Sequence, residues 1–498
     1  MADFSHIPLG QPIPNLPHAV SCSLPTMADV RGYEEKDPKL LKQLGSGYPR
    51  FVVHPFARRL ASELVKRHGL GDRILWLASS ERMARGLLGH LASEQASLFS
   101  GEGVSGVTHP AGSELAVRCK LYLQHIGGFL SSRHAEDLLA ALGLGAAPAP
   151  ENLFKGDSLA AVRLELRRAF PGVPDTGFLI ANSGMNAGFA AFKAISELQS
   201  ARGRKVWIQL GWLYLDTIAI LKKFSGPAGY AYAPNVADIE ALEGLFARHS
   251  GQVAGVLTEA PTNPLVQMPD LAAISSLCRR NGARLILDPS VASPFSVNCL
   301  AHSDVVVASL TKYTGNEGDV IAGLAVVNPA GPDSAELLTR IRAELEPVYP
   351  RDLARLAAQI QGTAETLARI EANVPIVAAY LAGHPKVREV YWALRSDSRE
   401  NFLRHARNPA ATGGMISFTL RTPMEPVYDR LRLPKGPSFG MKTTLICPFM
   451  YLAHYDLVTS AAGRAELAAS GLDPDLLRLS VGAEPADEII GALAEALA

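Results

Sequence analysis

The sequence has few cysteines, and they are widely spaced. In 498 residues there is no C-x-x-C pair and no spacing typical of a metal site; the five thiols are Cys22, Cys119, Cys278, Cys299 and Cys447. This usage is typical of reduced thiols in a cytoplasmic protein and argues against a disulfide-stabilised scaffold. We therefore expect a cytoplasmic location and no metal centre.

Net charge and long apolar runs are also lacking. Lys+Arg and Asp+Glu each number 48, so the formal net charge is zero. A neutral chain gives no reason to expect nucleic acid or an anionic membrane as a partner. No apolar run is long enough to span a bilayer, and the opening M-A-D-F-S-H-I-P lacks the basic and apolar regions of a signal peptide. We therefore expect neither a membrane anchor nor a secreted protein.

The length predicts two or three domains, and the residue pattern divides the chain into four parts. Residues 1–54 are rich in Pro and Gly and indicate an extended arm. Residues 55–157 have a mostly helical pattern. Strands and helices alternate in residues 158–345, which predicts an α/β domain with a mainly parallel sheet. Residues 346–498 begin with a long helical pattern and predict a smaller α+β domain.

A lysine follows one of the predicted strands. Residues 304–308 form a short β-branched run typical of a buried strand, and residues 309–314 (S-L-T-K-Y-T) follow it. Burial favours the uncharged amine of a lysine, which can attack a carbonyl. We interpret Lys312 as the residue that binds pyridoxal phosphate (PLP) as a Schiff base, with the hydroxyls of Ser309 and Thr311 near the cofactor phosphate. The alternative is a surface lysine after an ordinary strand.

Other polar residues stand at the ends of predicted strands in the same sheet. Asp288 ends the apolar run R-L-I-L-D, at the edge where ligands bind in open α/β sheets. It would pair with the pyridine nitrogen of PLP, or it caps the following turn. Residues 182–186 form a small-residue turn between a strand and a helix. The backbone N–H groups of such a turn suit a phosphate, although many turns have this composition.

Two further segments carry an arginine. Tyr48 and Arg50 are two apart on an extended segment, so their side chains point the same way. They could grip a phosphate or form an ordinary surface pair. Arg478 lies on the short alternating strand L-R-L-S-V-G, where it could bind a substrate carboxylate bidentately or face solvent.

Together these motifs resemble the PLP-dependent Cys/Met-metabolism family, which includes cystathionine γ-synthases, β-lyases and γ-lyases. The matching motifs follow the family order: Ser183-Gly184-Met185, Pro261-Thr262-Asn263-Pro264, Asp288, Ser309-x-Thr311-Lys312-Tyr313, Ser438 in a glycine turn, and Leu477-Arg478-Leu479-Ser480-Val481-Gly482. The N-terminal arm is similar to that of the longer fungal cystathionine γ-synthases. The resemblance implies the type I PLP-dependent transferase (aspartate aminotransferase-like) fold, an α/β large domain with a smaller C-terminal α+β domain.

The resemblance also implies a role for each matching residue of the large domain. Lys312 would bind the cofactor and move protons. Asp288 would pair with the pyridine nitrogen, and Asn263 would contact the ring hydroxyl. The phosphate would be held by Ser183, Gly184, Met185, Ser309 and Thr311.

The remaining implied roles concern the substrate and a second subunit. Arg478, helped by Ser438, would bind the carboxylate of a small amino-acid substrate. Tyr48 and Arg50 would reach the phosphate of a neighbouring subunit, where Tyr48 would also take part in catalysis. The active unit would then be at least a homodimer, and members of the family are usually tetramers.

Among the departures from the family pattern, one concerns an aromatic ring at the cofactor. The family usually has a tyrosine before a glycine, which stacks on the cofactor and takes part in proton transfer. Here that residue is Leu210, followed by Gly211. Trp212 and Tyr214 are the candidates to replace the ring.

The resemblance leaves the reaction open. The first hypothesis is γ-replacement on an O-acylated homoserine with cysteine, giving cystathionine. The alternative is γ-elimination from a γ-substituted amino acid, such as a halogenated allylglycine giving a terminal alkyne. The missing phenol favours this alternative, because a halide leaves without a proton. β-Elimination and a non-catalytic scaffold are further options; Lys312, Asp288 and Arg478 argue against the scaffold.

Overall fold

A seven-stranded sheet forms the centre of the computed structural model, which describes residues 4–46 and 52–498. Its order is β6-β12-β11-β10-β9-β7-β8. The bounds are β6 (Phe178–Ala181), β7 (Val206–Leu210), β8 (Tyr230–Ala233), β9 (Val253–Glu259), β10 (Arg284–Asp288), β11 (Val305–Ser309) and β12 (Gly323–Val327). Strands β8, β7, β9, β10 and β11 pair in parallel, and β12 pairs antiparallel with β11 and β6. The predicted, mainly parallel α/β sheet is confirmed.

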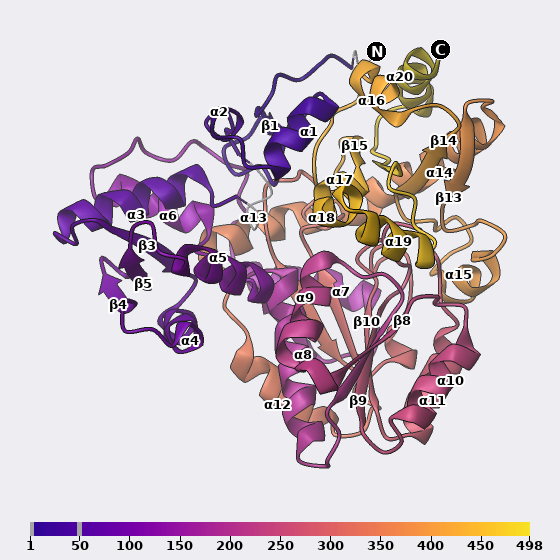
Figure 1. Ribbon diagram of the computed structural model, residues 1–498, viewed down its shortest axis with the longest axis horizontal. Coiled ribbons are helices and arrows are strands. Elements are labelled where there is room, and N and C mark those ends of the chain that lie inside the picture. Colours follow the sequence, from indigo (N-terminus) through magenta and orange to yellow (C-terminus); the bar gives the residue numbers. More distant parts are fainter. Residues whose placement is uncertain (1–3, 47–51) are drawn as a thin grey trace.

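Helices cover both faces of this sheet, because alternate apolar residues of each strand point to opposite sides. Trp207 and Ile286 pack with α8 (Gly184–Ser200), α9 (Leu215–Phe224) and α12 (Ser334–Glu344). Ile208 and Leu285 pack on the other face with α10 (Ile239–Arg248) and α11 (Leu271–Arg280). Figure 1 shows the two groups of helices on either side of the strands. Helix α7 (Ser158–Ala169) precedes β6.

The C-terminal region is built on a four-stranded antiparallel sheet of order β13-β14-β16-β15. The strands are β13 (Val387–Tyr391), β14 (Met415–Leu420), β15 (Leu445–Pro448) and β16 (Leu477–Ser480). Two long helical stretches lead into it, α13 (Pro350–Ile360) and α14 (Thr363–Gly383). The remaining helices are α15 (Arg399–His405), α16 (Met424–Arg430), α17 (Phe449–Ala453), α18 (Tyr455–Thr459), α19 (Ala461–Ala469) and α20 (Ala486–Leu497). The predicted smaller α+β part is confirmed.

The N-terminal arm is not wholly extended. It contains a short hairpin, β1 (Pro12–Ile13) and β2 (Ser21–Cys22), and the helices α1 (Met27–Glu34) and α2 (Pro38–Leu41). Helix α1 forms because Thr26 and Asp29 make a reciprocal capping box at its start. The backbone N–H of Met27 donates to Asp429 at 2.8 Å, which fixes the arm to the C-terminal region.

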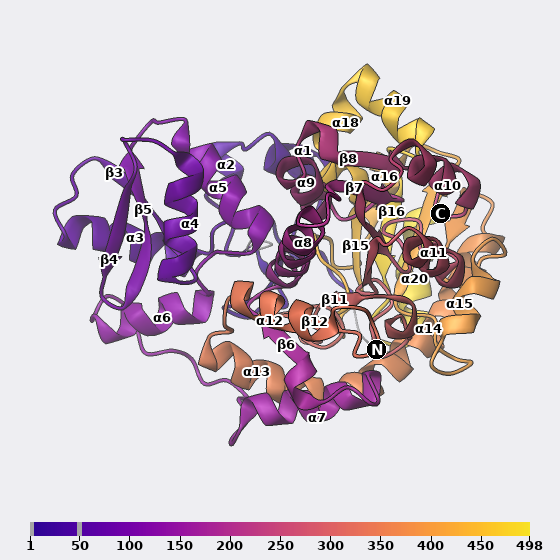
Figure 2. The same ribbon diagram turned by 90° about the horizontal axis from the view of Figure 1, so that it is seen from below.

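The segment predicted to be helical contains a sheet as well. Residues 55–141, called here the N-terminal module, comprise α3 (Pro55–Arg67), β3 (Arg73–Ala78), α4 (Glu81–Leu91), β4 (Ser97–Gly101), β5 (Val104–Pro110), α5 (Leu115–Ile126) and α6 (Ser132–Ala141). The β4–β5 hairpin was not predicted, because its Ser- and Gly-containing strands carry few apolar residues. The hairpin turns at Glu102 and Gly103, which have φ values of 52° and 78°. Figure 2 shows the module beside the main body.

A buried arginine anchors the module to the rest of the chain. Arg133, at the start of α6, is 1% exposed. Its guanidinium lies 3.1 Å from Asp319, 2.9 Å from Asp352 and 2.6 Å from Glu151. A charge this deeply buried is tolerated only when it is paired in this way.

The five cysteines are all buried free thiols. Among the described residues, no helix combines the length and the apolar character needed to cross a membrane.

Candidate active site

The candidate residues meet at the carboxyl edge of the central sheet. Strands β9, β10 and β11 are adjacent and parallel, so the polar residues at their ends lie side by side; Glu259 pairs directly with Asp288. A pocket of about 120 Å³ opens at this edge. Its lining includes every described candidate: Ser183, Gly184, Met185, Asn263, Asp288, Ser309, Thr311, Lys312, Ser438 and Arg478. Tyr48 and Arg50 lie outside the described residues.

Lys312 points into this pocket from the turn after β11 and is 5% exposed. Its Nζ donates to Ser438 Oγ at 2.6 Å and lies 4.7 Å from the centre of the Phe439 ring. The turn is held from the C-terminal region, because the backbone N–H of Tyr313 donates to the carbonyl of Gly440 at 2.6 Å. A Cβ at Gly440 would stand 2.9 Å from Tyr313 N, so this close approach requires glycine. Lys312 is therefore a buried amine, not a surface lysine.

Asp288 is a half-buried carboxylate at the end of β10, on the pocket wall. Its Oδ1 accepts the backbone N–H of Ser290 at 2.8 Å, so it does cap the following turn. Burial raises the pKa of its carboxyl above the ordinary value. A cation next to this carboxylate, such as a protonated pyridine, would offset that cost.

The start of helix α8 forms an anion cradle. Ser183 caps the helix by accepting the backbone N–H of Asn186 at 3.1 Å. A Cβ on Gly184 would lie 2.9 Å from the Cβ of Ser309, so only glycine lets α8 approach β11 this closely. The first-turn N–H groups of α8 point at the pocket with the positive end of the helix dipole, and Ser309 adds a hydroxyl. These groups fit the phosphate of PLP. The Thr311 hydroxyl also accepts the backbone N–H of Ala322 at 3.3 Å.

Arg478 is a buried cation on the pocket wall, 6% exposed, and does not lie on a solvated strand face. Its guanidinium carbon lies 5.1 Å and 4.5 Å from the ring centres of Phe439 and Phe449. Nη1 donates to Asn263 Oδ1 at 3.1 Å and Nη2 donates to the Ser438 carbonyl at 2.9 Å. A guanidinium held on both nitrogens keeps a fixed orientation and presents its remaining N–H groups to a carboxylate.

Glu259 is a site residue that the sequence analysis missed. Its Oε1 accepts the backbone N–H of Tyr214 at 2.6 Å, and its Oε2 accepts that of Asn263 at 3.0 Å. Burial, and then the neighbouring Asp288, raise the pKa of the Glu259 carboxyl well above its ordinary value. The available signal was its position: Glu259 ends an apolar strand just as Asp288 does.

The structure separates the two candidates for the missing tyrosine ring. Leu210 is buried in the core on one face of the sheet. Tyr214 lines the pocket that also contains Lys312 and Asn263. Trp212 instead donates its indole N–H to Nε2 of His454 at 2.9 Å. Tyr214 is therefore the aromatic residue of this loop that the pocket contains.

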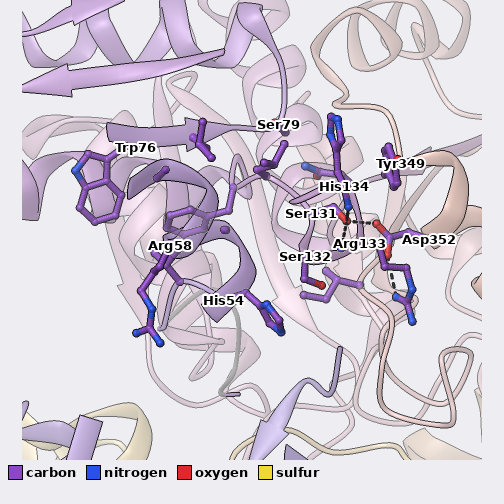
Figure 3. A pocket seen from close by; sticks show the side chains of 18 of the residues that line it. His54, Arg58, Trp76, Ser79, Ser131, Ser132, Arg133, His134, Tyr349 and Asp352 are labelled. Carbon is purple, nitrogen blue, oxygen red and sulfur yellow. Dashed lines mark hydrogen bonds and ion pairs between the residues drawn. The ribbon is translucent and has the colours of Figure 1, made fainter. Parts of the chain in front are cut away.

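A second, larger cavity of about 750 Å³ lies between the N-terminal module and the large domain (Figure 3). It shares Ser183 and Ile321 with the first pocket. Two of its charged groups are paired: Arg133 donates to Asp352, which also accepts the Ser131 hydroxyl, as Figure 3 shows. Because Lys312, Asp288 and Arg478 lie in the smaller pocket, we place the chemistry there.

Comparison with known proteins gives the same assignment of fold and cofactor. Residues 176–498 match the family of Cys/Met metabolism PLP-dependent enzymes. The structure is similar to the crystal structure of cystathionine γ-lyase from Lactobacillus plantarum complexed with L-serine, with a TM-score of 0.58 and 23% identity. That similarity covers 71% of this chain and 94% of the lyase, and it shows the fold.

Two curated relatives cover almost the whole chain. The L-2-amino-4-chloropent-4-enoate dechlorinase/desaturase of Streptantibioticus cattleyicolor is 37% identical over 474 residues, which is 95% of each protein. The cystathionine γ-synthase of Neurospora crassa is 26% identical over an alignment that covers 98% of each. Both alignments extend across the N-terminal module, which lies outside the segment that matches the family.

Proposed function

Because the chain belongs to the Cys/Met-metabolism family of PLP-dependent enzymes, we propose that it eliminates a substituent from Cγ of an L-amino acid. The substrate class that we infer is a γ-halogenated, unsaturated amino acid such as L-2-amino-4-chloropent-4-enoate. The observation that carries this proposal is the 37% identity, across 95% of both chains, to a dechlorinase/desaturase of that compound. The corresponding identity to the Neurospora cystathionine γ-synthase is 26%.

The pocket offers a group for each part of PLP. Lys312 would hold the cofactor covalently, Asp288 would face its pyridine nitrogen, and the start of α8 would take the phosphate. When bound, PLP supplies an electron sink that makes the Cα–H bond of an amino acid acidic.

The protein's own groups then bind the substrate and move its protons. Arg478 binds the α-carboxylate, and this fixes which bonds of the substrate face Lys312. The Lys312 amine accepts the proton from Cα and then one from Cβ, while Ser438 Oγ holds Nζ in place. Chloride departs from Cγ with the electron pair of the C–Cl bond and needs no proton. Protons return to Cβ and Cα and one proton is lost from the terminal CH2 carbon, so the net change is loss of HCl and one further unsaturation, which gives a terminal alkyne from the chloropentenoate.

A second candidate is γ-replacement with cysteine on an activated homoserine. Two observations support it: the similarity to the Neurospora cystathionine γ-synthase and the presence of Tyr214 in the pocket. The Tyr214 phenol could protonate a leaving group that needs an acid. This reaction would require both substrates, whereas elimination requires one.

We also propose that the active unit is a homo-oligomer, at least a dimer and most simply a tetramer. The proposal rests on the resemblance of Tyr48 and Arg50 to the family residues that reach the phosphate of a neighbouring subunit. Light scattering of the purified protein would give the mass of the assembly.

The decisive experiment incubates the purified, PLP-loaded protein with L-2-amino-4-chloropent-4-enoate, with and without cysteine. Chloride is measured with an ion-selective electrode and products by mass spectrometry. We expect one chloride released for each alkyne formed, without any need for cysteine. Release of chloride only together with a cysteine adduct would favour replacement, and no release from any γ-substituted amino acid would overturn the proposal.

A further inference from the structure

A buried hydrogen bond joins two distant segments behind the active-site pocket. Trp212, in the loop after β7, donates its indole N–H to Nε2 of His454, which follows α17. The two rings are 4.9 Å apart and nearly perpendicular, with an angle of 73° between their planes. The two residues are 242 positions apart in the sequence, so the bond holds together segments that the chain itself does not connect closely.

Each of these segments also contributes apolar residues to the pocket wall. Tyr214 and Leu215 follow Trp212 and line the pocket. Phe449, Leu452 and Ala453 precede His454 and line it as well. Trp212 and His454 are not part of the wall that the described residues form; they lie behind it and hold its two halves together.

This wall stands next to the carboxylate-binding arginine. The ring centre of Phe449 lies 4.5 Å from the Arg478 guanidinium carbon and 6.2 Å from the His454 ring. A substrate whose carboxylate binds Arg478 therefore has an apolar surface beside it for the carbons beyond Cβ. On this surface the side chains of Leu215, Phe449, Leu452 and Ala453 offer no polar group to bind water or a thiol near Cγ.

The geometry of the bond also defines the state of His454. Its Nε2 accepts the indole proton, so the neutral ring carries its own proton on Nδ1. Burial lowers the pKa of His454 to about 3, with a smaller contribution from Lys222. The ring therefore remains an acceptor at neutral pH.

We propose that the Trp212–His454 bond fixes an apolar wall that receives the side chain of a γ-substituted amino acid beyond Cβ and excludes water and thiols from Cγ. In this way the two residues act as positioning residues that commit the enzyme to elimination over replacement or hydration. The preferred substrate is then a short, unsaturated side chain with no polar group beyond the departing one. The effect of the wall on the choice of reaction rests on the proposed γ-elimination, but the wall itself can be tested by ligand binding without turnover.

The test compares binding of two unreactive amino acids to the PLP-loaded enzyme by the change in cofactor absorbance. L-Norvaline has carbons beyond Cβ, whereas L-alanine has none. In Trp212→Phe, which keeps a ring but loses the N–H donor, we expect norvaline to bind about tenfold more weakly while alanine binding is unchanged. Leu452→Ala, which shortens the wall and leaves the bond intact, is expected to show the same selectivity.

The chain offers a matched control for the lost bond. Trp76 donates to Nε2 of His109 at 3.0 Å in the N-terminal module, so Trp76→Phe removes the same type of hydrogen bond elsewhere. We expect this control to leave both affinities unchanged. Two results would overturn the inference. One is that Trp212→Phe weakens the binding of norvaline and of alanine equally. The other is that neither Trp212→Phe nor Leu452→Ala weakens norvaline binding.

Product analysis links the wall to the reaction. With the chlorinated substrate and added cysteine, Trp212→Phe is expected to give thiol adduct or hydrated product in place of part of the alkyne, with chloride release retained. An unchanged product ratio would contradict the assigned role. If the wild-type protein releases no chloride, the proposed function fails, and the norvaline and alanine comparison still decides whether the wall exists.

Discussion

Lys312 Nζ lies 2.6 Å from Ser438 Oγ, and this contact joins the large domain to the C-terminal region across the active-site pocket. Ser438 adopts φ of 91°, a backbone conformation that non-glycine residues rarely accept. The same residue offers its carbonyl to Arg478 at 2.9 Å. One strained residue thus orients both the amine that takes the proton and the guanidinium that binds the carboxylate, which is typical of strain at functional sites.

Replacing Lys312 by Ala should abolish covalent attachment of the cofactor. The expected result is loss of the absorbance band at the edge of the visible range and of all turnover, because no other amine reaches the same position in the described pocket. The measurement is an absorbance spectrum of protein purified with excess PLP. Lys435 is a matched control, since it is also buried but donates to the carbonyls of Pro25 and Tyr428. Lys435→Ala should lower stability yet keep the band.

Replacing Asp288 by Asn should change the pH dependence of stability in the PLP-free protein. Burial raises the folded-state pKa of Asp288 above its ordinary value of 3.8. At pH values between the ordinary and the raised pKa, the folded state therefore binds more protons than the unfolded state. The free energy of unfolding of the wild type should therefore fall as pH rises above about 4, by up to about 1.4 kcal/mol for each pH unit. Asp288→Asn removes this contribution.

The two PLP-free proteins are compared by urea unfolding from pH 4 to pH 7. We expect the difference in stability to shift in favour of Asp288→Asn as pH rises, and parallel curves would contradict the raised pKa. Glu259 remains in both proteins, but its pKa is raised in part by Asp288, so the variant also loses that part of the Glu259 contribution, which shifts the difference in the same direction. With PLP restored, the variant should bind the cofactor more weakly, because the pyridine nitrogen loses its anionic partner.

Replacing Arg478 by Lys should reduce kcat/KM by about 10- to 100-fold, because lysine keeps the charge but cannot bind a carboxylate through two parallel hydrogen bonds. The loss should appear mainly in KM, and L-alanine should bind more weakly in the absorbance titration. Arg388 lies in the same sheet with its side chain 48% exposed, so Arg388→Lys serves as the control. Weak alanine binding in both variants would show that the loss comes from a disturbed sheet and not from the carboxylate contact of Arg478.

The central sheet and the residues at its strand ends could be predicted because apolar strands ending in polar residues define one edge of a parallel sheet. Lys312 and Asp288 were identified in this way. Glu259 was visible at a strand end, but its role depends on accepting N–H groups from Tyr214 and Asn263, which only the folded chain brings to it. The Trp212–His454 bond and the β4–β5 hairpin could not be predicted, because one depends on long-range packing and the other on weakly patterned strands.

Replacing Arg133 by Met should loosen the N-terminal module. The Arg133 guanidinium pairs with Asp319, Asp352 and Glu151, and methionine would leave these carboxylates, two of them buried, with fewer partners. Removing one member of such a cluster costs about 3 kcal/mol or more. We expect lower stability in urea unfolding and faster proteolytic cleavage within residues 142–157, which connect the module to α7.

The control for this prediction is an exposed ion pair of similar geometry. Arg167 and Asp175 are 2.6 Å apart, with side chains 53% and 42% exposed. Exposed pairs contribute little because water and salt screen them, so Arg167→Met should leave both unfolding and cleavage close to those of the wild type. Asp319 follows Lys312 by seven residues, so a loosened anchor should also weaken PLP binding in Arg133→Met but not in the control. Unchanged cleavage and PLP affinity in Arg133→Met would show that the module is held by its apolar contacts alone.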